Sequence, residues 1–268
     1  MPTVADAIKL MRNIAPEEYA YKDGIENVGL IVGRLDAKVN KIMCCLDVSS
    51  RVIDEALEAG ANLIISHHPL IFLPVSSISC ETVLGQKLLR LAENKIAVYA
   101  SHTNLDFVAD GINDFVAERI GLKESKPLDA YISDDAGLGR IGDLSGKIPA
   151  SQLRDKVGLL LNDKFVRIIG DRAAQVRRIA VINGAGGGDT KYIDLAREAG
   201  ADCLVTADVK HHVAVYALDC GLTLIEPQHH TMEHCYIQRL VQLLKLEVKA
   251  HKLDVEVIQS AREAGIRN

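Results

Sequence analysis

The chain has 268 residues, 48% of them hydrophobic and 25% charged, so it can bury a large core as one big α/β domain or as two smaller ones. Its formal charge of -5 and its pI near 6.0 provide no basic surface for nucleic acid or anionic lipid. We therefore expect an ordinary soluble globular protein, and its charge argues against a nucleic-acid partner.

The N-terminal segment carries charges among its apolar positions and lacks the apolar centre of a secretion signal. No later stretch approaches the roughly 18 uncharged apolar residues of a membrane span. These features predict a cytoplasmic protein with no membrane partner. The six cysteines show no C-x-x-C spacing, and we expect buried free thiols without a disulfide framework or a thiolate zinc site.

Apolar runs of strand length alternate along the chain with amphipathic segments of helical period. The helical segments 51–60, 82–95 and 192–200 each close with Gly or Asn. This alternation is typical of βαβ units with mostly parallel strands, whose ligands lie at the C-terminal strand ends. The predicted strands are 41–48, 61–68, 95–102, 177–183, 201–208 and 222–228.

The two halves of the chain also resemble each other. EALEAGANLIISH from Glu55 aligns with LAREAGADCLVTA from Leu195, and each is followed by another strand and an H-x-x-x-acid element. Duplication predicts an α/β fold of repeated units with mixed, mostly parallel sheets, in two intertwined lobes that face a shared metal site. Chance similarity between two generic βα units is the alternative.

One stretch rich in Pro, Asp, Gly and Ser, residues 126–150, is the plausible boundary. We predict a metal-binding α/β lobe from residues 1–125 and 222–268. The second, inserted α/β lobe would be residues 126–221.

Two adjacent histidines, His67 and His68, end a predicted strand. They point to opposite faces if the strand continues, and both reach one cluster only if Pro69 turns the chain. The alternative is one buried structural histidine and one exposed histidine.

Two H-x-x-x-acid elements supply the other candidates. Asp106 is a candidate ligand or the N-cap of the following helix, and His102 is a candidate ligand, a group behind the ligands or a proton carrier. His229 and Glu233 lie four apart on one face of a predicted helix, so both can reach one ion or bridge two. The competing assignments are His230 with His234, or an exposed histidine-rich helix start.

Imidazole and carboxylate together suit a borderline divalent ion, and five or six such groups exceed what one tetrahedral ion needs. We therefore favour two metal ions that share a bridging carboxylate. Zinc, manganese, iron, cobalt and nickel all fit these ligands.

A glycine-rich loop from Gly184 to Asp189 follows a predicted strand. It lacks the Walker Lys and the third Gly of the dinucleotide fingerprint, so a tight βα turn with Asp189 as N-cap is favoured over a phosphate cradle. Lys191, Lys210 and Arg140 are the candidates that could supply charge to an anion.

Taken together, the motifs resemble the GTP cyclohydrolase I type 2 family, also called the Nif-three-like (DUF34) family, over nearly the whole chain. The combination of SHHPLIF from Ser66 with HTNLD from His102 is the most specific part. The other matching segments are 26–30, 46–48, 139–144, 184–188, 206–212 and 229–233.

This resemblance implies two divalent metal ions per subunit, with Glu233 contacting both ions. The implied ligands are His67, His68, Asp106, His229 and Glu233. It also implies a ring-shaped homo-oligomer, usually a hexamer. Two features depart from the family: Gln228-His229-His230 replaces the usual Gly-His, and Ile25-Glu26-Asn27 replaces Trp-Asp-Asn.

The family's named reaction implies a nucleotide substrate. Water opens the imidazole ring of GTP at C8, which releases formate and leads to dihydroneopterin triphosphate. Paired metal ions suit this hydrolysis, and His102, His211 and His212 are candidates for the proton transfers. The alternatives are a non-catalytic metal-binding scaffold or regulator and a two-metal hydrolase of another nucleotide.

Overall fold

The computed structural model describes residues 1–22, 26–130 and 132–263, and its chain divides into two compact units. The first unit comprises Met1–Leu105 and Tyr236–Asn268, and the second comprises Asp106–Cys235. The chain therefore leaves the first unit once and returns to it. Both crossings are made within a helix, α4 (Thr103–Phe107) and α9 (His229–Ala250).

The first unit is built on a five-stranded mixed sheet in the order β1-β4-β3-β2-β11. Strands β11, β2, β3 and β4 are parallel neighbours, and β1 runs antiparallel to β4. The register sets Ser66 opposite Ala100, so the chain leaves β3 and β4 at the same edge of the sheet. The strands are β1 (Gly29–Val32), β2 (Lys41–Cys45), β3 (Leu63–Ser66), β4 (Ala97–Ala100) and β11 (Glu256–Gln259).

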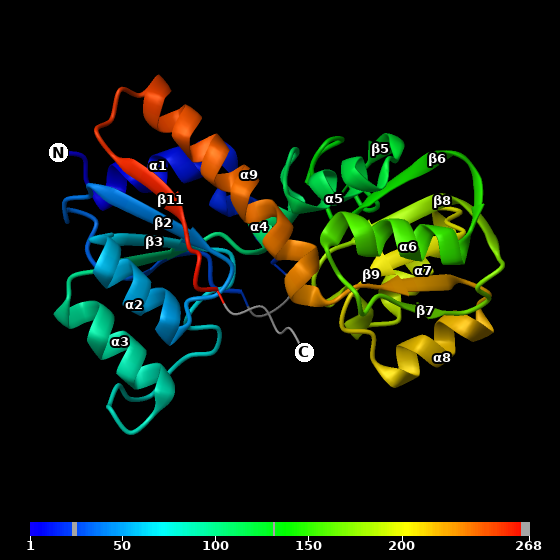
Figure 1. The fold of residues 1–268 in the computed structure, drawn as a ribbon, viewed down its shortest axis with the longest axis horizontal. Helices are drawn as coiled ribbons and strands as arrows, with labels where there is room; N and C mark the ends of the chain where they lie inside the picture. The colour runs from blue at the N-terminus through cyan, green and yellow to red at the C-terminus, as the bar shows by residue number, and fades with distance from the viewer. Residues whose placement is uncertain (23–25, 131, 264–268) are drawn as a thin grey trace. The chain divides into compact units, whose positions relative to one another are not determined.

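Helices cover both faces of this sheet. The helices α2 (Ser50–Ala59) and α3 (Val83–Glu93) pack with Met43, Ile64 and Val98 in one core cluster. Figure 1 shows α1 (Val4–Ile14) and the later part of α9 on the opposite side, and the 3-10 turn η1 (Glu17–Tyr19) follows α1. Because both faces are covered, the central strands β2, β3 and β4 are apolar along most of their length.

The second unit has a six-stranded mixed sheet in the order β5-β6-β8-β9-β10-β7, of which β8, β9 and β10 are parallel. Its core joins residues of β8, β9 and β10 to α7 and α8 (Figure 1). The strands are β5 (Lys123–Lys126), β6 (Arg140–Pro149), β7 (Arg167–Ile169), β8 (Gln175–Ile182), β9 (Cys203–Thr206) and β10 (Thr223–Glu226). The helices are α5 (Ile112–Ile120), α6 (Ala150–Leu161), the 3-10 turn η2 (Ala185–Gly188), α7 (Lys191–Glu198) and α8 (His211–Asp219).

The predicted α/β class with mixed sheets is confirmed, whereas the compact units differ from the predicted lobes at both boundaries. Helix α5 packs against β5, β6 and β8, so residues 106–125 belong to the second unit. Strand β10 lies between β9 and β7, so residues 222–226 also belong there. The boundary stretch 126–150 itself contains the long strand β6, because its polar composition fits a half-exposed antiparallel strand as well as a loop.

All six cysteines are free thiols, as expected. Cys44, Cys45 and Cys203 are buried in strands, and burial raises the pKa of Cys44 to about 12. Cys80 is exposed, contrary to the expectation of burial. None of the described helices is long and apolar enough to cross a membrane.

Arg140 was a candidate for anion binding, and the structure assigns it another task. Its side chain is 1% exposed, and its guanidinium pairs with Asp114 of α5, with Nη2 2.6 Å from Oδ2. It also donates to the backbone oxygens of Val108, Gly137 and Gly139. Arg140 is therefore a structural link between α5 and β6, and it is not available to a ligand.

We expect Arg140→Met to lower the free energy of unfolding by about 3 kcal/mol, because it leaves Asp114 and several carbonyl oxygens without their donor. The matched control is Arg177→Met, since the half-exposed Arg177 lies 3.5 Å from Asp143. That change should cost less than about 1 kcal/mol. Urea denaturation of both variants measures the difference in the free energy of unfolding. Equal losses would show that the buried Arg140–Asp114 ion pair stabilises the protein no more than the Arg177–Asp143 pair does.

Candidate metal centre

Three histidines gather at the C-terminal edge of the first unit's sheet. His67 and His68 follow β3, and His102 follows β4. The ring centroids of His67 lie 5.0 Å from His68 and 5.2 Å from His102, and those of His68 and His102 are 5.8 Å apart. One ligand nitrogen from each ring lies within 4.8 Å of the others. β3 ends at Ser66 and the chain bends at His67 and His68, so the adjacent histidines reach one cluster.

Each of these rings is held at Nδ1 by an acceptor of the same unit. His67 Nδ1 lies 3.0 Å from the carbonyl oxygen of Ser101, and His68 Nδ1 lies 2.9 Å from Asp47 Oδ1. His102 Nδ1 lies 2.8 and 3.0 Å from the two carboxylate oxygens of Glu26. A carbonyl or carboxylate oxygen can only accept, so Nδ1 donates in each ring and the neutral imidazole keeps its lone pair on Nε2.

Glu26 is the partner that sequence reasoning did not assign. Its carboxylate also accepts a hydrogen bond from the Thr103 hydroxyl. Burial raises the pKa of Glu26, but the hydrogen bonds from His102 and Thr103 outweigh it and leave the pKa below its usual value. Its only sequence signal was the carboxylate of the Ile25-Glu26-Asn27 motif, of which Ile25 lies outside the described residues.

In the second unit, one amide holds two buried carboxylates. Asn183, which follows β8, donates from Nδ2 to Asp106 Oδ1 at 2.8 Å and to Glu233 Oε1 at 3.2 Å. Asp106 and Glu233 are 9% and 2% exposed. Asp106 is not the N-cap of the following helix, because that position belongs to Gly111. Asn183 had gone unnoticed, although its place directly after a strand was a usable signal.

His229 lies between two carboxylates of the same unit. Its Nε2 is 2.9 Å from Glu233 Oε2, and its Nδ1 is 2.7 Å from Asp208 Oδ2. Burial lowers the pKa of His229, but hydrogen bonds with Glu233 and Asp208 outweigh it and raise the pKa to about 9. The rings of the competing pair, His230 and His234, stack on each other with centroids 4.9 Å apart.

Asp208, the partner of His229, is a third residue that sequence reasoning missed. Its backbone has a φ of 54°, a left-handed conformation that few residues other than Gly adopt. The next amide, of Val209, donates to the buried Glu226 at 3.1 Å, and Glu226 pairs with Arg167. This strained backbone beside a candidate ligand is typical of a functional site.

The glycine loop forms the tight βα turn that the sequence favours. Gly187 N–H donates to the Ala207 oxygen at 2.9 Å, and a Cβ on Gly187 would lie 2.5 Å from that oxygen. The carboxylate of Asp189 accepts from the Lys191 N–H at 3.0 Å, although the N-cap of α7 is Thr190. Gly187 therefore lets the loop pack closely against the backbone of Ala207 at this edge of the sheet.

Gly184 begins this loop and touches the candidate ligands directly. Its φ is 63°, and a Cβ there would lie 2.4 Å from Glu233 Oε1 and 3.5 Å from His229 Nε2. An added Cβ at Gly184 would therefore force the Glu233 carboxylate to move.

We expect Gly184→Ala to weaken metal binding by on the order of tenfold or more, because the added methyl group displaces Glu233. Gly221→Ala is the matched control, since Gly221 has a φ of 70° but nothing within 4 Å of the added Cβ. Both variants should lose about 1 kcal/mol of stability from the strained backbone. Chelator competition with Zn²⁺ separates them, and unchanged affinity in Gly184→Ala would refute the steric argument.

The remaining candidates lie on exposed positions. His211 and His212 are exposed in the first turn of α8, which Lys210 precedes. Their assignment to proton transfer stays a prediction.

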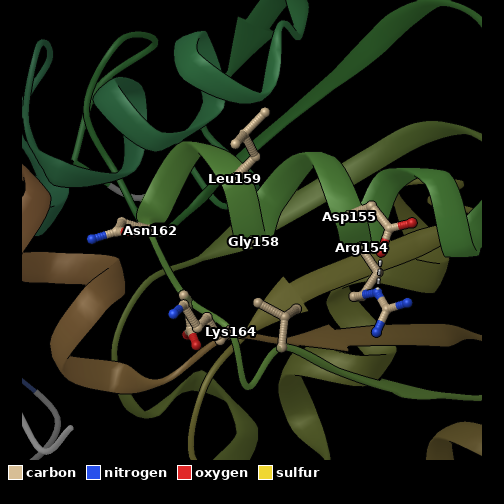
Figure 2. A pocket seen from close by; sticks show the side chains of 8 residues that line it. Arg154, Asp155, Gly158, Leu159, Asn162 and Lys164 are labelled. Atoms are coloured by element: carbon tan, nitrogen blue, oxygen red, sulfur yellow. Dashed lines mark ion pairs between the residues drawn. The ribbon is translucent and has the colours of Figure 1, made fainter.

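A groove of about 480 Å³ lies at the C-terminal end of α6 (Figure 2). Its buried Asp163 accepts hydrogen bonds from the Gln228 N–H at 2.6 Å and from the Thr231 hydroxyl at 2.8 Å. The groove thus adjoins the residue that fixes the first turn of α9, where His229 lies. Its lining residues are Arg154, Asp155, Gly158, Leu159, Asn162, Asp163, Lys164 and Val166.

The donor groups of both units fit a divalent metal ion. The first unit offers three oriented imidazoles, and the second offers an imidazole with two buried carboxylates. Imidazole nitrogen and carboxylate oxygen are ligands of zinc and of the neighbouring transition metals.

Comparison with known proteins gives a consistent result. The chain matches the family model described as Duf34/NIF3 (NGG1p interacting factor 3) over residues 2–264. It is 35% identical over 254 residues to a Clostridium acetobutylicum protein named GTP cyclohydrolase 1 type 2 homolog, covering 94% of this chain and 92% of that protein. A Clostridium perfringens protein of the same name is 33% identical over 256 residues, covering 95% of each chain.

Solved structures agree in fold. A Bacillus cereus protein related to NIF3 superposes with a TM-score of 0.93 at 25% identity, covering 100% of this chain and 99% of that chain. Reduced HcgD from Methanocaldococcus jannaschii gives a TM-score of 0.80 at 29% identity, covering 96% and 97% of the two chains.

Proposed function

Because the chain belongs to the Duf34/NIF3 family, we propose that it binds two divalent metal ions per subunit and uses them in hydrolysis. The observation that carries this proposal is the pair of buried carboxylates, Asp106 and Glu233, that share the amide of Asn183. Two like charges removed from water are costly unless a cation compensates them.

The proposed ligand set is the one that the family resemblance implies. Glu233 would serve both ions, and zinc, manganese, iron, cobalt and nickel remain the candidates. The three imidazoles and two carboxylates in this set match the donor chemistry of each of these metals. The ligand set is His67, His68, Asp106, His229 and Glu233.

The proposed reaction is opening of the imidazole ring of GTP, with formate release and formation of dihydroneopterin triphosphate. The names of the Clostridium relatives support this substrate. When bound, paired divalent ions lower the pKa of water and polarise a substrate atom. A ring-shaped homohexamer in the cytoplasm belongs to the same proposal and is supported by the family resemblance.

His102 is proposed as the proton carrier. Its Nδ1–H is fixed on Glu26, so Nε2 can take up a proton and return it while the ring keeps its orientation. His211 and His212 are proposed for further proton transfers, with their exposure as the supporting observation.

The test is turnover of GTP by the full chain reconstituted with zinc, manganese or iron, followed by formate release and pterin fluorescence. We expect metal-dependent product that is absent from the His67→Ala/Glu233→Ala control. If the fully metallated wild type forms no product, the substrate assignment is wrong. A metal-binding scaffold or a two-metal hydrolase of another nucleotide would then take its place.

A further inference from the structure

We propose that Phe72, which lies outside the proposed ligand set, is the platform on which the base of a purine nucleotide stacks. This role rests on the nucleotide substrate of the proposed function and deepens it, because it names the residue that holds the base. The base, and not the phosphate chain, would then lie next to the histidines, as opening of the imidazole ring requires.

The backbone is anchored immediately before Phe72. Leu70 packs against the core cluster of α2 and α3. The side-chain amide of Asn27 donates a hydrogen bond to the carbonyl oxygen of Ile71. The backbone that carries the Phe72 ring is therefore held in place, so binding of a ligand on the ring would cost little conformational freedom.

The ring of Phe72 stands next to the histidine cluster. Its centroid lies 6.1 Å from that of His102, and the two rings are inclined by 89°. In such a perpendicular pair one ring directs its edge at the face of the other, so His102 covers at most one face of Phe72. Because Phe72 is 46% exposed, part of its ring is accessible to a ligand.

Exposed apolar side chains continue from Phe72 along the connection between β3 and α3. The far end of this connection is fixed as well, because the Gln86 side chain donates to the carbonyl oxygen of Cys80 at 2.7 Å. Contiguous exposed apolar side chains commonly mark a binding surface, and Phe72 is the aromatic member of this one. The exposed apolar residues of the segment 72–78 are Phe72, Leu73, Pro74, Val75 and Ile78.

The flat surface of a purine fits an exposed phenyl ring. Removal of an aromatic side chain from a stacked base typically weakens binding by about 5- to 150-fold. Stacking uses the π face that all bases share, so Phe72 should serve guanine and adenine alike. A sugar phosphate without a base offers no such face and should not depend on Phe72.

The test is calorimetric titration of the full chain, in the presence of Zn²⁺, with GMP, AMP and ribose 5-phosphate. We expect Phe72→Ala to weaken the binding of GMP and AMP by at least about fivefold and to leave the binding of ribose 5-phosphate unchanged. Phe72→Tyr keeps an aromatic ring and should bind both nucleotides within about twofold of the wild type. Val83→Ala is the matched control, because it removes a 67% exposed apolar side chain of α3 and should change none of the three dissociation constants.

Unchanged affinity for GMP and AMP in Phe72→Ala would overturn the stacking platform. An equal loss for ribose 5-phosphate, or a wild type that binds neither nucleotide, would overturn it too. The proposed reaction can fail separately. A wild type that binds both nucleotides through Phe72 but releases no formate from GTP would refute the cyclohydrolase assignment and leave the platform standing. Formate release by Phe72→Ala with an unchanged KM for GTP would show the reverse.

Discussion

Glu233→Gln is expected to abolish the stabilisation of the protein by divalent metal, with a loss of affinity of at least about 100-fold. The change keeps the size of the side chain and an oxygen that can accept from Asn183, but it removes the charge that both proposed ions share. At a metal concentration of about 100 times Kd, metal binding raises the free energy of unfolding of the wild type by about 2.7 kcal/mol. The variant should show almost no such increase.

Thermal denaturation with and without Zn²⁺ or Mn²⁺ measures this effect. Glu247→Gln is the control, because Glu247 lies on the same helix. Its carboxylate accepts a hydrogen bond from Asn13, which is not a candidate ligand. Its metal-dependent shift in Tm should equal that of the wild type. An undiminished shift in Glu233→Gln would remove Glu233 from the ligand set.

Asp208→Asn is expected to weaken metal binding by about 10- to 100-fold, the usual effect of removing a carboxylate that orients a histidine ligand. Asp208 accepts the Nδ1–H of His229 at 2.7 Å and so directs Nε2 toward Glu233. Asn tolerates the left-handed backbone of this position, so the metal-free protein should keep its stability.

The experiment measures Zn²⁺ affinity by indicator competition and the Tm of the metal-free protein. The two values together distinguish an effect on the orientation of His229 from an effect on folding. Asp219→Asn, an exposed change on α8, is the matched control and should leave both values unchanged. A fall in the metal-free Tm with no change in affinity would show that Asp208 acts only on the fold.

Much of the fold was readable because its elements have strong local signals. The strands of both parallel cores appear as short apolar runs, and α2 follows from its amphipathic period, its Ser49 N-cap and the left-handed Gly60. The boundaries of the compact units cannot be derived from the sequence, because a strand joins whichever sheet pairs with it. Nothing within the sequence of β10 shows that it lies between β9 and β7.

The candidate site was predictable to the extent that its residues recur at fixed spacing. The adjacent His67 and His68 and the H-x-x-x-acid elements could be found in this way. Glu26, Asn183 and Asp208 were missed, because each acts through hydrogen bonds to residues distant in sequence. Arg140 was misread for the same reason, since its partner Asp114 lies 26 positions away.

The sequence by itself determined the α/β class, the family and the histidines and carboxylates that can bind metal, because periodicity and short motifs are local properties. Only the tertiary structure decided which oxygen holds each imidazole, and hence which nitrogen of His67, His68 and His102 keeps its lone pair. Hydrogen bonds set the tautomer of a histidine, and their partners are chosen by the folded chain.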